Sequence, residues 1–418
     1  MTEKKRILVI ADSPTAPSGV GTQTRYMIES MLRTGEFKFF CLAGAIRHPD
    51  YRIQKIEPYG DDFLIKPVDG YGDANIIRKA FKDFKPDILW FMTDPRFYVW
   101  LWQISSELRK KVPFVYYHVW DNYPYPMFNK KYYDSNDMVC TISKVTDNIV
   151  RTVSPEVECV RIPHTVDTEI FKKKTEQSDN EIRSRISDSH EGKTIFFWNN
   201  RNARRKQSGT LIFWFKEFLD KVGHDKAALV MHTEPKDPNG QDLVAIMHNL
   251  GLVNGEVILS TQKMSSADLA NVYSAVDCTI NISDAEGFGL ATLESLACET
   301  PIIVNMTGGL QEQVTNGDKW FGVGIHPCSK AIIGSQEVPY IYEDRLNKEQ
   351  FLEAMLEFYN KTSQEKTEMG KEGRKHVLDE YGFAKYAGNW YQALNSAIDK
   401  FGSWENRKNY KHWSIEEL

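Results

Sequence analysis

The chain alternates short apolar runs with longer stretches in which apolar residues recur at helical spacing. In the first part the runs fall near 6–11, 38–42, 87–92, 113–117, 138–142 and 158–162. A second series falls near 194–198, 227–231, 256–259, 278–282 and 301–304. Apolar runs that alternate with helical segments are typical of a parallel sheet with helices on both faces. The pattern therefore predicts two Rossmann-like, doubly wound α/β domains.

A polar stretch separates the two series. Residues 171–193 are rich in charge and show no apolar period, so we expect a linker there between domains at 1–170 and 194–382. Residues 383–418 are aromatic-rich, and their first half has helical spacing. The length of 418 residues exceeds what a single core usually holds, which agrees with two domains.

One strand-to-helix junction carries candidate chemistry. The run 278–283 is β-branched, residues 290–298 have helical spacing, and Asp284-Ala285-Glu286-Gly287-Phe288-Gly289-Leu290 lies between them. The free N–H groups and the dipole of a helix N-terminus favour a diphosphate, and the two glycines allow the backbone to approach it. Glu286 and Glu294 are then placed to accept hydrogen bonds from sugar hydroxyls.

The string from Glu286 to Val304 resembles the E-x7-E signature of retaining glycosyltransferases of family 4, which have the GT-B architecture of two domains facing across a cleft. The resemblance implies that Glu286 contacts the donor sugar and that Glu294 binds the ribose of the nucleotide. It also places Gly287, Phe288, Gly289 and Leu290 in the donor-binding turn. The alternative is a pair of solvated carboxylates beside an ordinary turn.

A second match follows the strand near 194–198. Arg201 and Lys206 have the spacing of the family's Arg and Lys, which clamp the donor diphosphate. Fixed cations offset the charge that develops on a departing diphosphate, so no metal is expected. Asn200 stands where the family usually has glycine. Arg204 and Arg205 are interpreted as solvated loop charges.

Two matches lie in the first domain. Gly19 and Gly21 follow the first strand and are similar to the family's glycine-rich loop near the donor phosphates; a dinucleotide site is the alternative, but the spacing is not G-x-G-x-x-G. His118 ends another apolar strand, and the resemblance implies that it lines the cleft and contacts the donor sugar. The alternative for His118 is a core histidine with a backbone hydrogen bond.

Candidates for acceptor binding also follow strand ends in the first domain, where open α/β sheets bind ligands. They are Asp94, Arg96, Trp120, Asp121 and Tyr123. Trp120, Tyr123 and Tyr125 lie among prolines, and we expect them to be exposed and able to stack on a sugar or a base. The alternatives are helix caps and a loop that only packs on its neighbours.

The composition of the chain bears on its class of protein and on its expected location in the cell. Hydrophobic residues make up 41% and charged residues 26%, as in soluble globular proteins, and no run of about 20 apolar residues predicts a membrane span. No signal peptide is recognised, and the six scattered cysteines contain no C-x-x-C pair. We therefore expect reduced thiols and a cytoplasmic location. The net charge of -5 argues against a general nucleic-acid binder.

The predicted function is transfer of a sugar, with retention, from a nucleoside diphosphate sugar to a hydroxyl of a saccharide or glycoconjugate. A UDP-sugar is the expected donor, and no cofactor is expected. One alternative is a phage-type enzyme that glycosylates a hydroxymethylated base in DNA, since residues 1–165 carry 23 Lys+Arg against 20 Asp+Glu. Another is a sugar-nucleotide epimerase or hydrolase of the same fold.

Overall fold

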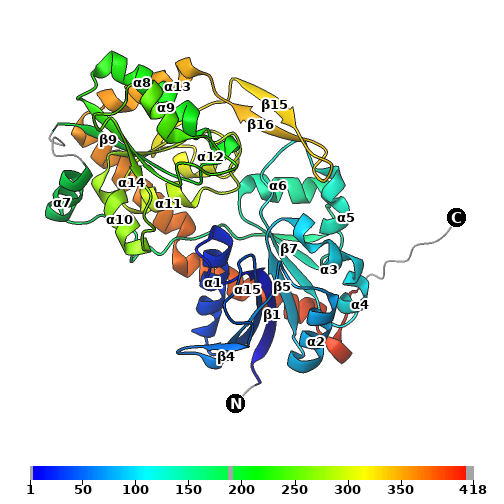
Figure 1. Ribbon diagram of the computed structural model, residues 1–418. Helices are drawn as coiled ribbons and strands as arrows, with labels where there is room; N and C mark the ends of the chain where they lie inside the picture. Colours follow the sequence, from blue (N-terminus) through cyan, green and yellow to red (C-terminus); the bar gives the residue numbers. More distant parts are fainter. Residues whose placement is uncertain (1–2, 187–191, 411–418) are drawn as a thin grey trace. The chain divides into compact units, whose positions relative to one another are not determined.

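The computed structural model describes residues 3–186 and 192–410, and the chain divides into two compact units (Figure 1). Unit 1 comprises residues 3–165, 334–339 and 384–410. Unit 2 comprises residues 166–186, 192–333 and 340–383. Each unit is built on its own mainly parallel sheet, so the predicted α/β class is confirmed. The expected cleft between the two domains stays a prediction.

The sheet of unit 1 has the strand order β3-β4-β2-β1-β5-β6-β7-β8. All neighbouring strands are parallel except β3 and β4. The strands are β1 (Lys5–Asp12), β2 (Phe37–Gly44), β3 (Gln54–Ile56), β4 (Gly60–Pro67), β5 (Ile88–Met92), β6 (Phe114–His118), β7 (Met138–Thr141) and β8 (Glu158–Arg161). The central strands β5, β6 and β7 are buried along their whole length because helices cover both faces of the sheet.

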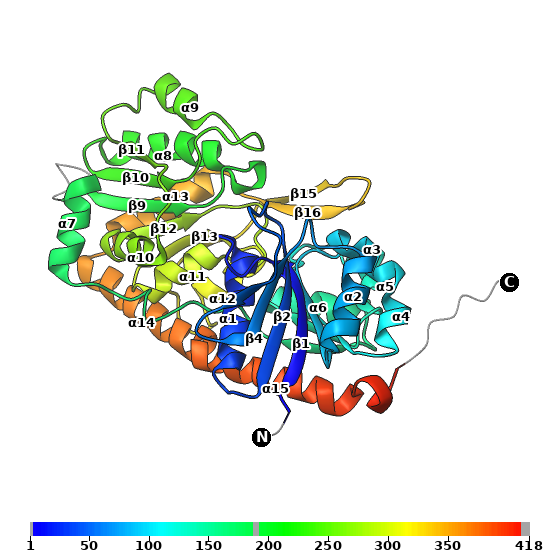
Figure 2. The ribbon, with the colours of Figure 1, turned by 60° about the horizontal axis from the view of Figure 1, so that its bottom comes forward.

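Helices lie on both faces of this sheet, and Figure 2 shows α1 on one face and α2 on the other. The helices of unit 1 are α1 (Gly19–Leu32), α2 (Ala74–Phe84), α3 (Val99–Gln103), α4 (Ser105–Arg109), α5 (Lys130–Tyr133), α6 (Lys144–Val153) and the C-terminal α15 (Phe383–Phe401). Trp390 of α15 is fully buried and makes edge contacts with the rings of Trp90 and Tyr117. The C-terminal helix is therefore part of the core of unit 1.

The sheet of unit 2 has the order β11-β10-β9-β12-β13-β14, and all its strands are parallel. They are β9 (Thr194–Asn199), β10 (Ala227–His232), β11 (Val257–Ser260), β12 (Cys278–Asn281), β13 (Ile302–Asn305) and β14 (Gly322–Ile325). A separate antiparallel hairpin pairs β15 (Ser329–Ile333) with β16 (Ile341–Arg345).

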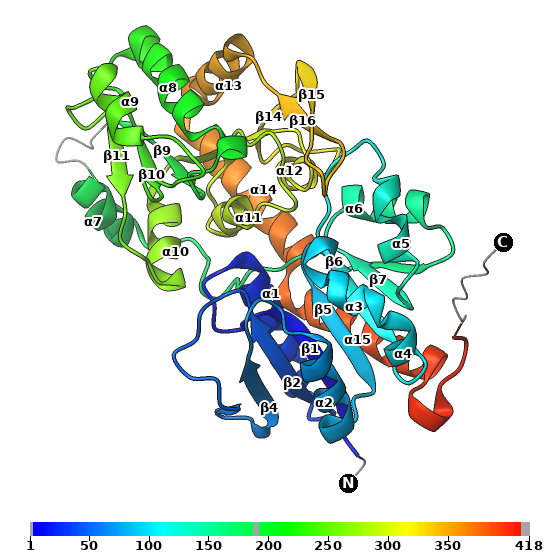
Figure 3. The same ribbon diagram turned by 45° about the vertical axis from the view of Figure 1, so that its right-hand side comes forward.

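Two helix layers enclose this second sheet, with α8 and α13 on one side and α10 and α11 on the other (Figure 3). The helices are α7 (Glu176–Ile186), α8 (Ser208–Val222), α9 (Leu243–Asn249), α10 (Ser266–Ala275), α11 (Leu290–Ala297), α12 (Leu310–Val314), α13 (Lys348–Asn360) and α14 (Ser363–Tyr381). Phe215 and Phe218 of α8 pack on Phe196 of β9, and Phe358 of α13 joins them. This aromatic packing buries the apolar stripe of each helix against the sheet.

The structure differs from the sequence expectation at 171–193, where we expected a linker. Residues 176–186 form α7, which belongs to unit 2. The helix has no apolar period because polar contacts, and not an apolar face, attach it to unit 2. Arg183 donates to the carbonyl oxygen of Ala275 at 2.8 Å and pairs with Asp277 at 3.1 Å. Over residues 3–186 and 192–410, no helix is both long and apolar enough to cross a membrane.

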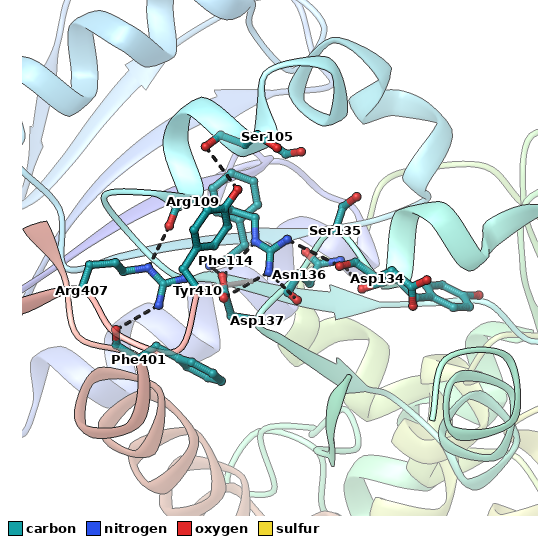
Figure 4. A network of polar contacts seen from close by, with 12 residues as sticks. Ser105, Arg109, Phe114, Asp134, Ser135, Asn136, Asp137, Phe401, Arg407 and Tyr410 are labelled. Atoms are coloured by element: carbon teal, nitrogen blue, oxygen red, sulfur yellow. Dashed lines mark hydrogen bonds and ion pairs between the residues drawn. The ribbon is translucent and has the colours of Figure 1, made fainter. Parts of the chain in front are cut away.

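A buried ion cluster attaches the end of the chain to unit 1 (Figure 4). The Asp137 carboxylate accepts from Arg109 Nε at 3.1 Å, from Arg407 Nη2 at 2.6 Å and from the backbone N–H of Phe114 at 2.9 Å. The Asp137 and Arg407 side chains are only 2% and 4% exposed. Arg407 Nε also donates to the carbonyl oxygen of Arg109 at 2.8 Å. The carboxylate thus joins α4, the start of β7 and the C-terminal segment.

Asp137→Ala should destabilise unit 1 strongly, because two buried guanidinium groups lose their counter-charge. We expect the free energy of unfolding to fall by about 3–5 kcal/mol in urea titrations. The control is Asp134→Ala, which breaks a surface pair with Lys130 and should cost about 1 kcal/mol or less. Equal losses in the two variants would contradict a dominant role for the cluster.

Candidate functional site

The candidate site in unit 2 lies at the point of the sheet where the order of strand addition reverses. Chain order runs from β9 outward to β10 and β11, and then returns to β12 on the other side of β9. The loops that leave β9 and β12 therefore diverge to opposite faces, and a crevice between such loops is the usual ligand site of open α/β sheets. These two loops carry the Arg201–Lys206 and Glu286–Leu290 segments predicted from the sequence.

Backbone contacts fix the glycine turn before α11. Gly289 precedes the helix with a φ of 88°, a left-handed conformation that favours glycine, and an added Cβ would come within 2.5 Å of Leu310. The Gln313 amide donates to the carbonyl oxygens of Phe288 at 2.6 Å and Gly289 at 3.1 Å. The N–H of Gly309 donates to the carbonyl oxygen of Glu286 at 3.1 Å. The turn is thus held rigidly beside the first N–H groups of α11.

An ion pair between Lys206 and Glu286 joins the two loops. Their side chains are 8% and 14% exposed. Burial raises the pKa of Glu286, but the charges of Lys206 and Arg205 outweigh this, so its pKa lies below the ordinary value. The structure therefore brings together a buried cation, an ionised carboxylate and a helix N-terminus.

The other basic residues of the β9 loop, Arg204 and Arg205, are exposed, as expected for solvated charges, and each also has a polar partner. Arg205 donates to the carbonyl oxygen of Ala285, and its own carbonyl accepts from the N–H of Asp284 at 2.8 Å. Arg204 pairs with the buried Glu343 of β16 at 2.9 Å. Arg201 is also exposed and pairs with Asp237 at 2.6 Å. The structure thus pairs Lys206, but not Arg201, with Glu286.

Two further carboxyl groups near these loops have raised pKa values. Burial raises the pKa of Glu294 in α11 to about 7, and a hydrogen bond from the Tyr273 hydroxyl partly opposes this. Burial also raises the pKa of Asp284 to about 6, opposed by Gln207 and Arg345. Arg345 lies 2.7 Å from the Asp284 carboxylate and Gln207 Nε2 lies 2.6 Å from it. Both carboxyl groups are therefore easier to protonate than exposed ones.

In unit 1, Gly19 and Gly21 lie at the start of α1, at the corresponding switch between β1 and β5. The Ser18 hydroxyl caps this helix by accepting from the N–H of Gly21 at 3.0 Å and donates to Asp12 at 2.6 Å. A Cβ at Gly21 would lie 2.6 Å from the carbonyl oxygen of Ser13. Gly21 therefore permits the close packing of the loop on its helix.

His118 differs from its expected role. It is fully buried at the end of β6, and its ring nitrogens lie 3.0 Å from the hydroxyl of Tyr116 and 2.7 Å from that of Tyr133. Burial lowers the pKa of His118 to about 3, so the ring stays neutral. In the structure it is a core histidine with both nitrogens occupied by tyrosines, and it presents no free nitrogen to a sugar.

The acceptor candidates lie in two loops of unit 1: Asp94 and Arg96 follow β5, and Trp120, Asp121 and Tyr123 follow β6. Asp94 caps the short turn Pro95–Tyr98 by accepting from the N–H of Arg96 at 2.9 Å, and its carboxylate also binds the Arg96 guanidinium at 2.8 and 2.7 Å. Trp120 is only 7% exposed, contrary to expectation, because its ring packs on Phe128 and its Nε1 donates to the carbonyl oxygen of Asn122. Asp121 and Tyr123 are half-buried in the same loop, and Tyr125 is exposed.

The sequence reasoning missed several polar residues at these sheet edges. Asp12 directly ends β1 and accepts from the hydroxyl of Tyr71 at 2.8 Å, so the strand-end rule that selected Asp94 would also have selected it. Tyr273 and Asp284 gave weaker signals. Tyr273 lies inside a helix, and Asp284 lies two residues before the first glutamate of the motif. Among the described residues, no three His, Cys, Asp or Glu side chains are grouped to hold a metal ion.

In a comparison with known protein families, residues 179–376 match the family described as glycosyl transferases group 1. A D-inositol 3-phosphate glycosyltransferase of Gordonia bronchialis is 30% identical over 135 residues, which is 29% of each chain. An alpha-monoglucosyldiacylglycerol synthase of Streptococcus pneumoniae is 26% identical over 206 residues, 48% of this chain and 44% of that protein. The chain thus spans less than half the length of these curated relatives.

Solved structures match over nearly the whole chain. A sucrose-phosphate synthase from Thermosynechococcus elongatus has a TM-score of 0.72 at 16% identity and covers 94% of this chain and 100% of its own. An Anabaena protein in complex with UDP-glucose has a TM-score of 0.70 at 14% identity, covering 94% and 99%. At these identities the likeness concerns the fold alone.

The raised pKa of Glu294 predicts a pH-dependent stability that Glu294→Gln removes. Between pH 4.5, its ordinary pKa, and about 7, folded Glu294 holds a proton that the unfolded chain releases. The free energy of unfolding should therefore fall with rising pH, by on the order of 1–3 kcal/mol relative to Glu294→Gln. Urea titrations at several pH values measure this difference.

The effect of Asp284 is present in both proteins and cancels in that difference. Glu349→Gln, at an exposed position in α13, is the control and should follow the wild-type pH profile. If the profiles of wild type and Glu294→Gln run parallel between pH 4.5 and 7, the raised pKa is wrong.

Proposed function

We propose that this chain, which has the GT-B fold and carries a glycosyl transferases group 1 domain at residues 179–376, is an enzyme that transfers a sugar from a nucleotide sugar to an acceptor hydroxyl. The observation that supports this most directly is the Lys206–Glu286 pair, which lies beside the glycine turn and the start of α11 at the switch point of unit 2. A cation, free N–H groups and carboxylates at one sheet edge suit a sugar diphosphate.

In this proposal Lys206 binds the donor diphosphate together with the first N–H groups of α11. Lys206 already has an anionic partner in Glu286, and that pairing holds the ammonium group at the crevice. Arg201 would have to turn from Asp237 to reach the phosphates, and its exposure leaves it room to do so. The negative charge that the diphosphate gains as it departs is then met by fixed cations.

The carboxylates have separate proposed roles. Glu286 is ionised and accepts hydrogen bonds from hydroxyls of the donor sugar, and Glu294 accepts from the ribose hydroxyls. Gly287 to Leu290 supply backbone contacts to the diphosphate. A UDP-sugar is the proposed donor, supported by the UDP-glucose complex of the Anabaena structure.

The proposed reaction retains the configuration at the anomeric carbon. The bond from this carbon to the β-phosphate oxygen breaks, the acceptor oxygen bonds to the same face, and the acceptor proton passes to the departing phosphate. Glu286 is not assigned as a nucleophile, because its ion pair with Lys206 directs it to binding. Lys206 stabilises the developing charge.

We place the acceptor at the switch point of unit 1, between the ends of β1 and β5. Asp12 and Asp94 offer carboxylate oxygens there, and the exposed ring of Phe97 packs on Tyr71 at 5.3 Å between centroids. Aromatic rings and carboxylates suit a polyhydroxylated acceptor such as a saccharide or glycoconjugate. Nothing in the structure favours modified DNA over such an acceptor.

Nucleoside diphosphates should stabilise the protein against heat, and Lys206→Ala should abolish this. At a ligand concentration of 100 times Kd the wild type gains about 2.7 kcal/mol. A thermal-shift screen with uridine, guanosine, adenosine and thymidine diphosphates and their sugars measures the gain. Glu294→Ala should lose it for the nucleotide that binds the wild type.

Lys221→Ala, at the exposed far end of α8 from Lys206, should keep the full gain. If none of the nucleotides stabilises the wild type, the proposed donor site is wrong. If one of them binds but the donor sugar is freed or epimerised without any acceptor, a hydrolase or epimerase replaces the transferase.

A further inference from the structure

We propose that Glu343, in strand β16 of the hairpin, is a positioning residue for the donor site: it binds Arg204 and so fixes the turn that carries Lys206. The inference rests on the proposed function, because it assumes that Lys206 meets the donor diphosphate. The sequence motifs did not single out Glu343, which lies outside every motif segment.

The turn that carries Lys206 needs support from outside its own segment. Arg204–Lys206 is a single 3₁₀ turn between β9 and α8. The next residue, Gln207, has a φ of 56°, a left-handed conformation that residues with a side chain rarely adopt. A short turn with such an end is not stable by itself, so contacts with other segments must hold it.

Glu343 holds the first residue of this turn. Its side chain is only 2% exposed, whereas that of Arg204 is 59% exposed. Arg204 Nη1 donates to Glu343 Oε2 at 2.9 Å, and Arg204 Nη2 donates to Glu343 Oε1. Two parallel hydrogen bonds fix both the position and the orientation of a guanidinium group. Arg204 is thus anchored to a carboxylate that solvent hardly screens.

The contacts of Glu343 close into a ring that also holds the other end of the turn. Arg345 Nη2 donates to Glu343 at 2.5 Å, and Arg345 Nη1 donates to Asp284 at 2.7 Å. Asp284 accepts in turn from Gln207 Nε2 at 2.6 Å. The ring therefore runs from Glu343 through Arg204, the turn, Gln207, Asp284 and Arg345 back to Glu343.

This ring supports both partners of the ion pair at the donor site. Lys206 lies between Arg204 and Gln207, and Glu286 lies two residues after Asp284. A cation that is already in place binds a diphosphate without the cost of ordering its side chain. Opening the ring would leave the ammonium group of Lys206 to be ordered by the ligand.

The sign of the effect separates positioning from simple electrostatics. Glu343→Gln removes a negative charge, and the change of charge alone would strengthen the binding of a nearby anion. A positioning role predicts the opposite, because Arg204, once released, no longer holds the turn of Lys206. Weaker binding of a diphosphate is therefore the result that only positioning explains.

The test compares the affinities of the wild type and Glu343→Gln for uridine diphosphate, by calorimetry, and for uridine, by saturation-transfer NMR. The ratio of the two affinities isolates the diphosphate, since both ligands carry the same nucleoside. In Glu343→Gln the affinity for uridine diphosphate should fall about fivefold, and the affinity for uridine should stay within about twofold of the wild type. Unchanged uridine binding shows that the nucleoside part of the donor site is still folded.

Two further variants sharpen the test. Gln207→Leu opens the same ring at its other end without any change of charge, and it should lower the ratio by about two- to threefold. It also decides the question if Glu343→Gln does not fold. Asp344→Asn is the matched control, because it removes a negative charge from the next residue of β16, whose carboxylate accepts from the Thr307 hydroxyl at 2.7 Å. Its ratio should equal or exceed that of the wild type.

Two outcomes would overturn the proposal, and they are distinguishable. If the wild type binds uridine diphosphate more tightly than uridine, and both Glu343→Gln and Gln207→Leu leave the ratio unchanged or raise it, the role of Glu343 is wrong and the donor site stands. If the wild type binds neither ligand, or binds both alike, the proposed diphosphate site for this nucleotide fails, and the role of Glu343 fails with it.

Discussion

The ion pair between Lys206 and Glu286 is the contact on which the arrangement of the site depends. The two residues come from loops that leave neighbouring strands toward opposite faces of the sheet, so nothing in the sheet itself holds the loops together. Arg204 and Arg205 add contacts to Glu343 and to the carbonyl oxygen of Ala285. The pair also keeps Glu286 ionised despite its burial, because the neighbouring cations hold its pKa below the ordinary value. The binding chemistry and the local rigidity of unit 2 therefore come from the same residues.

The parallel strands were predictable because they are buried on both faces. β1 and β9 each contain an unbroken run of buried apolar residues, and their positions agree with the expected runs at 6–11 and 194–198. Strands without such an unbroken apolar run were missed by the sequence analysis. β4 carries three charged residues, β14 contains two glycines in four residues, and β15 is largely exposed and pairs only with β16 in a hairpin. Their stability comes from neighbours that the local sequence does not reveal.

The candidate site was predictable where chemistry is local, and not where it depends on packing. Glu286 and the glycine turn lie in one short segment, and Lys206 matched at a fixed spacing, so both were found. The position of His118 at a strand end was correct, but its burial depends on Tyr133 of the distant α5. Tyr273 was not found, because a tyrosine inside a helix gives no signal until the fold places its hydroxyl against Asn199. The predicted roles of the site residues await the binding measurements.

The place of α15 in the core of unit 1 also determines when that unit can form. Trp390 fills the space beside Trp90 and Tyr117, and Arg407 neutralises Asp137, yet both residues come after the whole of unit 2 in the chain. When all eight strands of unit 1 have been synthesised, the residues of α15 that complete the core of this unit have therefore not yet been made. The nascent first unit must wait, with an apolar face uncovered, while unit 2 is synthesised. Proteolytic removal of the chain after residue 383 would for the same reason leave unit 1 with an incomplete core.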